Sequence, residues 1–212
     1  SNKSVQRYNN AVRDRIYPEK NEVQPGDNFM VVRNNYKYDL LNGEFGEIKN
    51  ILSGSEIIPL TLKKTSGAIK VELKFKSVTV EVLNMNGEKI QFDCKIIENL
   101  LDSKKPQLTS DEQRALYVLF RIRMKEKGIK PNKNEFKEAL KNDPYFNALL
   151  IKYGYAVTCH KAQGGEWDTT IIDYYYSANK LKQFYFRWCY TALTRSKNKM
   201  FCVNQPDIGV GG

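Results

Sequence analysis

The sequence predicts an α/β protein in which a small antiparallel β-domain is inserted between a short N-terminal helix and a C-terminal α/β segment. Three observations support this prediction. Between residues 28 and 97, apolar and polar residues alternate along short stretches, which is the period of a β-strand with one exposed face. Residues 110–127 space their apolar side chains with the period of a helix. The last residues, from about 153 onward, follow the order strand, loop, strand, helix, strand, which is typical of one side of an α/β sheet.

The composition is that of a globular, basic protein. Its 212 residues suffice for one large domain or two small ones, and 41% of them are apolar and 12% aromatic, which excludes a disordered chain. Lys and Arg exceed Asp and Glu by 34 − 24 = 10, a charge that favours polyanions such as nucleic acid, phosphates or an acidic membrane surface. Because the lysines are scattered along the chain, a merely solubilising surface is the alternative.

The cysteine and histidine content argues against a metal site. The chain has one histidine and four cysteines, and the cysteines form no C-x-x-C or other metal-ligand spacing. We expect no bound metal and free, mostly buried thiols in the reducing cytoplasm. No apolar run approaches the length of a membrane span, so we expect no membrane partner. The abrupt start of the sequence is consistent with a piece of a longer protein.

The N-terminal half is predicted element by element. Residues Asn9–Ile16 form a short helix that Pro18 ends. The apolar residues of the stretch from Ile69 to Phe75 have the opposite parity to those from Val78 to Val82, so a bulge or turn is expected near Lys76–Ser77. Further short strands are expected at Asn28–Arg33, Phe45–Ile51 and Ile57–Lys63. Asn86–Gly87 predicts a two-residue hairpin that leads into a strand ending at Cys94, and together these strands describe a small barrel or sandwich.

Two helices and three further strands follow. The first helix spans Ser110–Lys127, with Ser110 and Gln113 as a capping box and Gly128 after its end. A second, short helix at about Asn134–Lys141 stops before Asp143–Pro144. Beyond it we expect strands at Tyr153–Thr158, Thr169–Tyr176 and Lys199–Asn204, with a helix at Gln183–Arg195 before the last strand.

The stretch "YAVTCHKAQGGEW" (Tyr155 to Trp167) concentrates polar groups in the loop after the first of these C-terminal strands. Gly164 and Gly165 let the backbone approach a ligand and direct N–H groups toward it, and Glu166 can accept from a ribose hydroxyl. Trp167 is expected to pack beneath the loop. Four side chains can donate to phosphate or sugar oxygens: Thr158, His160, Lys161 and Gln163. These types predict a phosphate- or nucleic-acid-facing loop, with an ordinary polar turn as the alternative.

Nucleophilic catalysis is disfavoured at this loop. Cys159 adjoins His160, but neighbours on an extended chain point to opposite faces, and no G-x-S-x-G elbow is present. His160 is therefore expected to be a hydrogen-bonding group. Arg195, at the end of the helical "YTALTR", can either interact with the helix dipole or stabilise charge on a transferring phosphoryl group.

These two stretches carry a family resemblance. "YAVTCHKAQGGEW" resembles motif V and "YTALTRS" resembles motif VI of superfamily-one helicases, most closely the RecD-like and Dda-like branch with its UvrD-like C-terminal domain. Upstream, "GDNFMVVRNNYKYDLLNGEFGEI" resembles the entry to the SH3-like barrel that this branch inserts into its second RecA-like domain. "SNKSVQRYNNAVR" resembles the segment before that insertion. The likeness spans nearly the whole chain, thinly between residues 51 and 145.

The resemblance implies a fold and a division into domains. The fold is a partial RecA-like sheet, the second motor domain of a P-loop NTPase, with an inserted small SH3-like β-barrel and a helical connection. The implied ranges are 1–24 for the start of the RecA-like domain, 25–100 for the barrel, 101–150 for the helical connection and 151–212 for the remainder of the RecA-like domain.

The resemblance also implies roles for the loop residues. Thr158, His160 and Lys161 would contact single-stranded DNA, and Arg195 would be the finger toward the γ-phosphate of ATP. Ser196 stands where alanine is common in motif VI, a mild departure that leaves the role of Arg195 intact. The residues that would border the nucleotide are Gln163, Gly164, Gly165 and Glu166.

The chain contains no G-x-x-x-x-G-K-[ST] phosphate-binding loop. ATP and Mg²⁺ are therefore expected to bind only together with a first motor domain outside this sequence, and the chain alone is expected to be inactive. Two other functions remain open: a nucleic-acid-binding module without motor function, and a subunit of an ATP-dependent exonuclease. The second is disfavoured, because nuclease chemistry generally needs clustered carboxylates and none is found. DNA and RNA as substrates are not distinguished.

Overall fold

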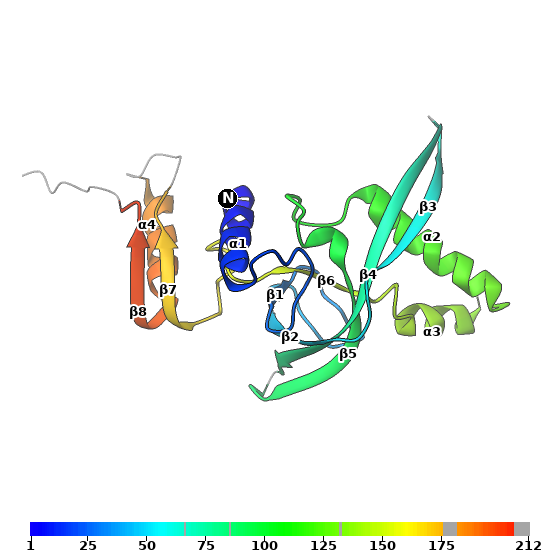
Figure 1. Ribbon diagram of the computed structural model, residues 1–212, viewed down its shortest axis with the longest axis horizontal. Helices are drawn as coiled ribbons and strands as arrows, with labels where there is room; N and C mark the ends of the chain where they lie inside the picture. The colour runs from blue at the N-terminus through cyan, green and yellow to red at the C-terminus, as the bar shows by residue number, and fades with distance from the viewer. Residues whose placement is uncertain (66, 85, 132, 176–181, 206–212) are drawn as a thin grey trace, which may run out of the picture. The chain divides into compact units, whose positions relative to one another are not determined.

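The computed structural model describes all residues except 66, 85, 132, 176–181 and 206–212. The chain divides into two compact units, Ser1–Ala156 and Val157–Gly212, each of which is described by itself. Helices and a six-stranded sheet occur in the first unit, and a strand–helix–strand arrangement occurs in the second (Figure 1). The predicted mixed α/β class is confirmed.

Five strands of the first unit close into a ring. The strand order is β2-β1-β6-β5-β4-β3, and β2 also pairs with β4, so that β1, β2, β4, β5 and β6 surround a common core. All pairings are antiparallel except that between β5 and β6. The bounds are β1 Asn28–Val31, β2 Phe45–Ile51, β3 Glu56–Lys64, β4 Gly67–Leu83, β5 Lys89–Ile97 and β6 Leu149–Tyr153.

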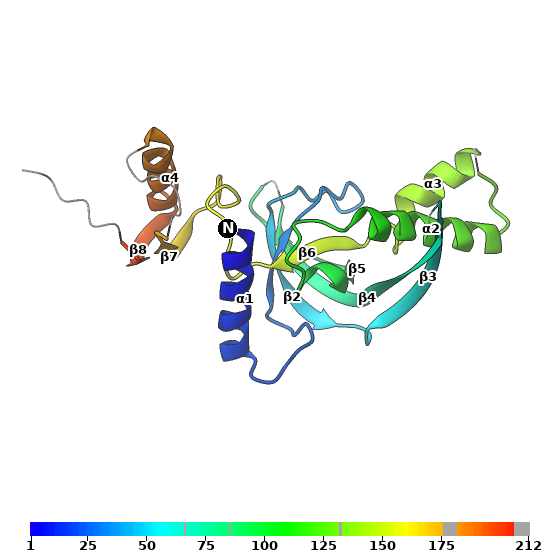
Figure 2. The ribbon, with the colours of Figure 1, turned by 90° about the horizontal axis from the view of Figure 1, so that it is seen from above.

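Strand β4 is one continuous element, and the bulge predicted at Lys76–Ser77 is wrong. Its pairing with β5 runs without a shift from Phe75 to Leu83, and the register shift lies instead in β2, between Ile48 and Asn50. The parity changes because the two halves of β4 bury opposite faces. The first half forms a ribbon with β3 that packs against α2, and the second half faces the core of the ring (Figure 2).

Lys76 lies where β4 changes its buried face. Its side chain is 1% exposed, and its ammonium group forms ion pairs with Glu22 at 2.6 Å and with Glu98 at 3.4 Å. A buried cation is tolerated only when opposite charges compensate the lost hydration. The hydrogen bond from Lys76 lowers the pKa of Glu22.

The helices of the first unit are α1 (Asn2–Ile16), α2 (Ser110–Glu126) and α3 (Asn134–Asn142), with a 3₁₀ turn η1 at Glu98–Leu100. Helix α1 begins seven residues earlier than predicted because the Ser1 side chain caps it by accepting from the Ser4 N–H. The capping box of α2 is shifted by one residue from the prediction. Thr109 is the N-cap, and its reciprocal partner is Glu112, at 2.7 and 3.2 Å.

The end of α2 has the geometry of a Schellman motif. The Gly128 N–H donates to the Lys125 carbonyl at 3.0 Å, and the Ile129 N–H donates to the Met124 carbonyl at 2.9 Å. Gly128 has φ +71°, a conformation that glycine adopts at little cost, so the predicted end of the helix is confirmed. Ile129 and Met124 belong to one apolar cluster.

The hairpin predicted at Asn86–Gly87 forms with a longer loop. The last cross-strand pair is Leu83 with Lys89, so the connection is not a two-residue turn. The Asn84 carboxamide oxygen accepts from the N–H groups of Asn86 and Glu88, both at 2.9 Å, and this side-chain cap favours the longer connection.

The strand predicted at Tyr153–Thr158 lies instead at Leu149–Tyr153, where an apolar run is buried between β1 and β5. Gly154 follows the strand, and a side chain is excluded there because a Cβ would lie 2.9 Å from the carbonyl carbon of Phe29. Beyond Gly154 the Asn9 side chain takes the place of a neighbouring strand. Its carboxamide donates to the Ala156 carbonyl at 3.0 Å and accepts from the Ala156 N–H at 2.8 Å.

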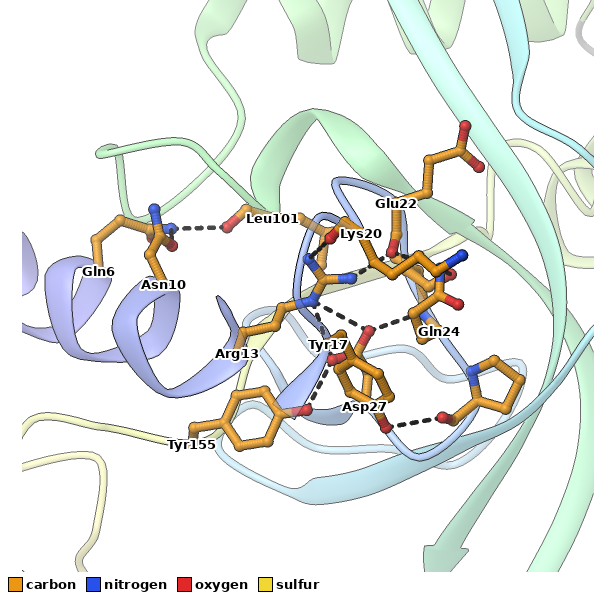
Figure 3. A network of polar contacts seen from close by, with 12 residues as sticks. Gln6, Asn10, Arg13, Tyr17, Lys20, Glu22, Gln24, Asp27, Leu101 and Tyr155 are labelled. Carbon is orange, nitrogen blue, oxygen red and sulfur yellow. Dashed lines mark hydrogen bonds and ion pairs between the residues drawn. The ribbon is translucent and has the colours of Figure 1, made fainter. Parts of the chain in front are cut away.

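A buried polar network joins α1 to the loop that enters β1 (Figure 3). The Arg13 guanidinium donates from Nε to both carboxylate oxygens of Asp27, at 3.1 and 3.2 Å, and from its other nitrogens to the carbonyls of Lys20 and Glu22. The Tyr155 hydroxyl donates to Asp27 at 2.7 Å. Arg13 is 5% exposed and Asp27 1%, so this network fixes α1 through a fully buried charge pair.

The second unit consists of β7 (Trp167–Asp173), α4 (Gln183–Leu193) and β8 (Ser196–Val203). The two strands are parallel, as expected for strands joined through a helix. Tyr185 and Ala192 of α4 pack on Ile172 of β7. The three elements were predicted with boundaries shifted by up to three residues, and Tyr176, the predicted end of the middle strand, lies outside the described residues.

Candidate functional site

The loop between Thr158 and Gly165 is built from consecutive tight turns, which confirms its prediction as a loop. The N–H groups of Lys161 and Ala162 donate to the Thr158 carbonyl at 2.9 and 3.0 Å, and the Gly165 N–H donates to the Ala162 carbonyl at 3.1 Å. Thr158 and Lys161 are half-buried, whereas Gln163 is exposed in the second turn. The backbone conformation of the loop is thus fixed locally.

The two glycines serve different purposes. Gly164 has φ +86° with no atom near the position of a Cβ, so backbone conformation is what favours glycine there. At Gly165 a Cβ would lie 2.5 Å from the indole ring of Trp167, so close packing is what excludes a side chain. Trp167 is half-buried against this glycine, as expected of a residue that packs beneath the loop.

Arg195 joins the end of α4 to this loop. Its Nη1 donates to the Gly165 carbonyl at 3.0 Å, its Nε donates to the Thr191 carbonyl at 3.0 Å, and its Nη2 donates to the Thr194 hydroxyl at 2.9 Å. All three acceptors are uncharged. The structure therefore brings Arg195 together with the predicted loop and holds its guanidinium group in one orientation, between the end of α4 and the loop.

Glu166 has a neighbour that the sequence did not reveal. Its carboxylate lies 3.6 Å from the ammonium group of Lys197, and the side chains are 57% and 59% exposed. An ion pair in this much solvent is weak. Glu166 is therefore held loosely enough to exchange this partner for another. The pair depends on the parallel register that places Trp167 opposite Ser196, which sequence spacing does not provide.

His160 and Cys159 have separate environments. The His160 ring is exposed and lies 6.3 Å from the Phe184 ring, at an interplanar angle of 29°. The Cys159 thiol donates to the Trp188 carbonyl at 3.6 Å, and burial raises its pKa. Because the thiolate is the nucleophilic form of cysteine, a Cys159 thiol that stays protonated and donates a hydrogen bond to α4 is a poor nucleophile. Phe184 was not among the predicted site residues, because nothing in the sequence relates it to His160.

Ser196, the departure from the helicase pattern, fits its position. Its hydroxyl forms a hydrogen bond with that of Thr170 across the β7–β8 pair. Ser196 thus contributes a cross-strand contact beside Arg195, whose guanidinium group bonds to other acceptors.

In the described part of the chain, no group of three or more His, Cys, Asp or Glu side chains could hold a metal ion. No helix among those residues is both long and apolar enough to cross a membrane. Cys94, Cys159, Cys189 and Cys202 are free thiols, of which Cys94 is buried, and burial raises its pKa to about 12.

Comparison with known proteins points to one family. Residues 153–203 match the UvrD-like helicase C-terminal domain. This match confirms, for residues 153–203, the resemblance to the C-terminal domain of a superfamily-one helicase. No curated protein matches the chain.

The similar solved structures include two of Pif1 from Bacteroides sp. The complex with ADP-AlF4 is 15% identical, with 85% of this chain and 29% of that chain covered and a TM-score of 0.26. The unliganded protein is 14% identical, with 88% and 32% covered and a TM-score of 0.28. This chain thus spans about a third of their length.

Proposed function

We propose that the chain is the C-terminal motor-domain part of an ATP-dependent DNA helicase or translocase, in which it contributes contacts to single-stranded DNA and the arginine finger for ATP hydrolysis. The observation that carries the proposal is the hydrogen bond between Arg195 and Gly165, within the segment that matches the helicase family. It joins the two stretches that resemble motifs V and VI.

Arg195 suits the role of the finger by its charge and its fixed position. Among the residues the structure describes, it forms no ion pair, so its charge is not neutralised by a carboxylate. Neutral acceptors hold it in place. A preorganised cation stabilises charge that develops on a transferring phosphoryl group without reorganising first.

The remaining nucleotide contacts are assigned to the second turn of the loop. Gln163, Gly164 and Gly165 would border ATP, and Glu166 would exchange the exposed Lys197 for a ribose hydroxyl. These residues would form only one side of a nucleotide site, because the loop that would bind the phosphates on the other side is not in this sequence. ATP and Mg²⁺ would bind between this side and an N-terminal RecA-like domain of the same protein, and this chain alone would hydrolyse nothing.

The DNA contacts are assigned to the first turn, at Thr158, His160 and Lys161. A hydroxyl, an exposed imidazole and an ammonium group at the start of one loop suit the backbone of a single strand, where the net charge of +10 also assists. The two turns share one short backbone segment. Movement of a bound strand at the first turn would therefore reach the nucleotide at the second.

The domain boundaries implied by the helicase resemblance belong to the proposal. The closed ring of five strands supports an inserted SH3-like barrel, which begins near residue 25. Its fifth strand, β6, follows α2 and α3, so we place the end of the insertion after β6 and treat residues 101–148 as the helical connection within it. Residues 1–24 and 157–212 would then belong to the second RecA-like domain. The protein would act in the cytoplasm, where its free thiols stay reduced.

The DNA-facing half of the proposal is tested with Lys161→Ala in the full-length protein. The DNA concentration that half-saturates ATPase stimulation should rise several-fold, while kcat at saturating DNA is retained. The slope of log affinity against log salt should decrease by about 0.7, because one phosphate contact is lost. Lys199→Ala, on exposed β8, is the matched control and should change neither quantity. An unchanged DNA dependence in the Lys161 variant would remove the DNA assignment.

A nucleic-acid-binding module without motor function is the second candidate, and the basic charge together with the closed ring favours it. A chain truncated after Ala156 separates the two candidates, since this is the boundary between the compact units. Single-stranded DNA binding that survives the truncation at full affinity would favour the module. Loss of most of the affinity would favour the motor-domain assignment.

A further inference from the structure

An open groove lies between the C-terminal half of α2 and the start of α3, in a part of the first unit to which the helicase proposal gives no role. Figure 2 shows the two helices side by side, joined by the turn that follows α2. The volume of the groove is about 520 Å³. Its apolar floor includes Ile122, Ile129 and Phe136, of which Ile122 is 43% exposed. A large apolar side chain can therefore be buried there.

The rim of the groove is cationic. Arg121, Lys125 and Lys130 line it and are exposed, and no carboxylate is among its lining residues. In the described part of the chain, none of these three side chains forms an ion pair. Glu126 and Glu135 lie on the same segments but do not line the groove.

Two other cations of the same helices have carboxylate partners. Arg123 pairs with Asp143 at 2.5 Å, and Lys141 pairs with Glu138 at 3.1 Å. Among the described residues, the three cations at the groove have no such partner, and they lie beside an apolar floor. This combination favours a ligand that is both acidic and apolar.

Two carbonyl groups at the end of α2 are not free to face a ligand. The carbonyl groups of Met124 and Lys125 accept from Ile129 and Gly128, so they are occupied within the chain. The same turn places Ile129, at the position after the capping glycine, in the floor of the groove. The end of α2 and the turn after it thus supply both the cations of the rim and part of the apolar floor.

The geometry points to this groove as a docking site for an acidic peptide segment of a partner protein, with one or two large apolar side chains in the floor and flanking carboxylates on Arg121, Lys125 and Lys130. A peptide fits better than a nucleic acid strand. Bases bind single-strand proteins by stacking on open aromatic faces. Among the described residues that line the groove, the one aromatic residue is Phe136, which is only 8% exposed and packs edge-on against Phe120 at 5.1 Å.

The test is a selection of random twelve-residue peptides displayed against the full chain, followed by fluorescence anisotropy with the best labelled synthetic peptide. Selected peptides should carry net negative charge and at least one large apolar residue. Their affinity should fall by about 10-fold or more in the Arg121→Glu, Lys125→Glu double variant and in Ile122→Ser. The Lys137→Glu, Lys141→Glu double variant, on exposed α3 outside the groove, lowers the net charge by the same amount and should bind normally.

Because the altered side chains are exposed, the variants should fold, and circular dichroism with thermal unfolding verifies this. The double variant should also prefer peptides in which the carboxylates are replaced by lysines. The proposal is overturned if no peptides are enriched, if they are neutral or basic, or if the groove variants bind them normally. It is equally overturned if a labelled ten-nucleotide dT strand, rather than an acidic peptide, loses affinity in the double variant.

Discussion

Arg195 donates a hydrogen bond from Nη1 to the carbonyl oxygen of Gly165 at 3.0 Å, across 30 positions of sequence. This contact makes the turn-rich loop and the end of α4 into one wall of a site. The loop cannot shift without changing the environment of the guanidinium group, and Gly165 is itself held against Trp167. Small changes in the loop should therefore affect the chemistry assigned to Arg195.

Alanine substitutions at the two loop glycines should have different consequences. In Gly165→Ala the new methyl group would overlap the Trp167 ring, so the loop must shift, tryptophan fluorescence should change and ATP turnover of the full-length protein should fall. In Gly164→Ala the space is open and only the positive φ is unfavourable, which costs about 1 kcal/mol of stability. Fluorescence spectra and thermal unfolding measure both effects. Equal spectra for the two variants would contradict this account.

The buried pair of Arg13 and Asp27 should be sensitive to the loss of one partner. Asp27→Asn keeps the shape but leaves a buried guanidinium group without a countercharge, so the free energy of unfolding should fall by about 3–5 kcal/mol. Adding Arg13→Met should recover part of this loss. The control is Glu138→Gln in the exposed pair with Lys141, which should cost under about 0.5 kcal/mol. Denaturant unfolding gives these values, and similar losses in both single variants would contradict the prediction.

The contact between Glu22 and Lys76 should make stability depend on pH. Lys76 lowers the pKa of Glu22 below its ordinary value of 4.5. A carboxyl group with a lowered pKa stabilises the folded state above its unfolded pKa, and this stabilisation disappears as the pH falls through the folded pKa. Glu22→Gln should thus be less stable than the unaltered protein at pH 7, with a difference that shrinks below about pH 4.5.

Urea unfolding between pH 3 and pH 7 measures the dependence for Glu22→Gln. Glu135→Gln, on exposed α3, is the control and should follow the curve of the unaltered protein. A constant difference between the Glu22 variant and the unaltered protein over this range would show that the ion pair does not act through titration of Glu22.

Elements with strong local signals could be predicted from the sequence. Strand β2 was predicted with its observed bounds because its alternation and flanking turns are local. The end of α2 at Gly128 is likewise a local signal. The strand at Leu149–Tyr153 was misplaced because a short apolar run does not reveal its partners, here β1 and β5. The role of Asn9 as a cap for Ala156 depends on residues 147 positions apart.

The candidate site shows the same division. The types of residue in the loop, and the arginine after the helix, were evident from composition and spacing. The packing of Trp167 beneath the loop was also predicted. The hydrogen bond between Arg195 and Gly165 and the pair of Glu166 with Lys197 were not, because they depend on the parallel register of β7 and β8. The buried Arg13–Asp27 network was missed because charged residues are ordinarily expected at the surface.

The most direct test of the central proposal is DNA-stimulated ATP hydrolysis by the full-length protein with Arg195→Ala. We expect kcat to fall by a factor on the order of 10³ or more, because the charge on the transferring phosphoryl group loses its stabilising cation. Affinity for single-stranded DNA should be unchanged, and Arg187→Ala, which alters an exposed arginine of α4, should retain normal turnover. Near-normal turnover in the Arg195 variant would contradict the assignment of Arg195 as the finger and, with it, the proposed role of this chain in ATP hydrolysis.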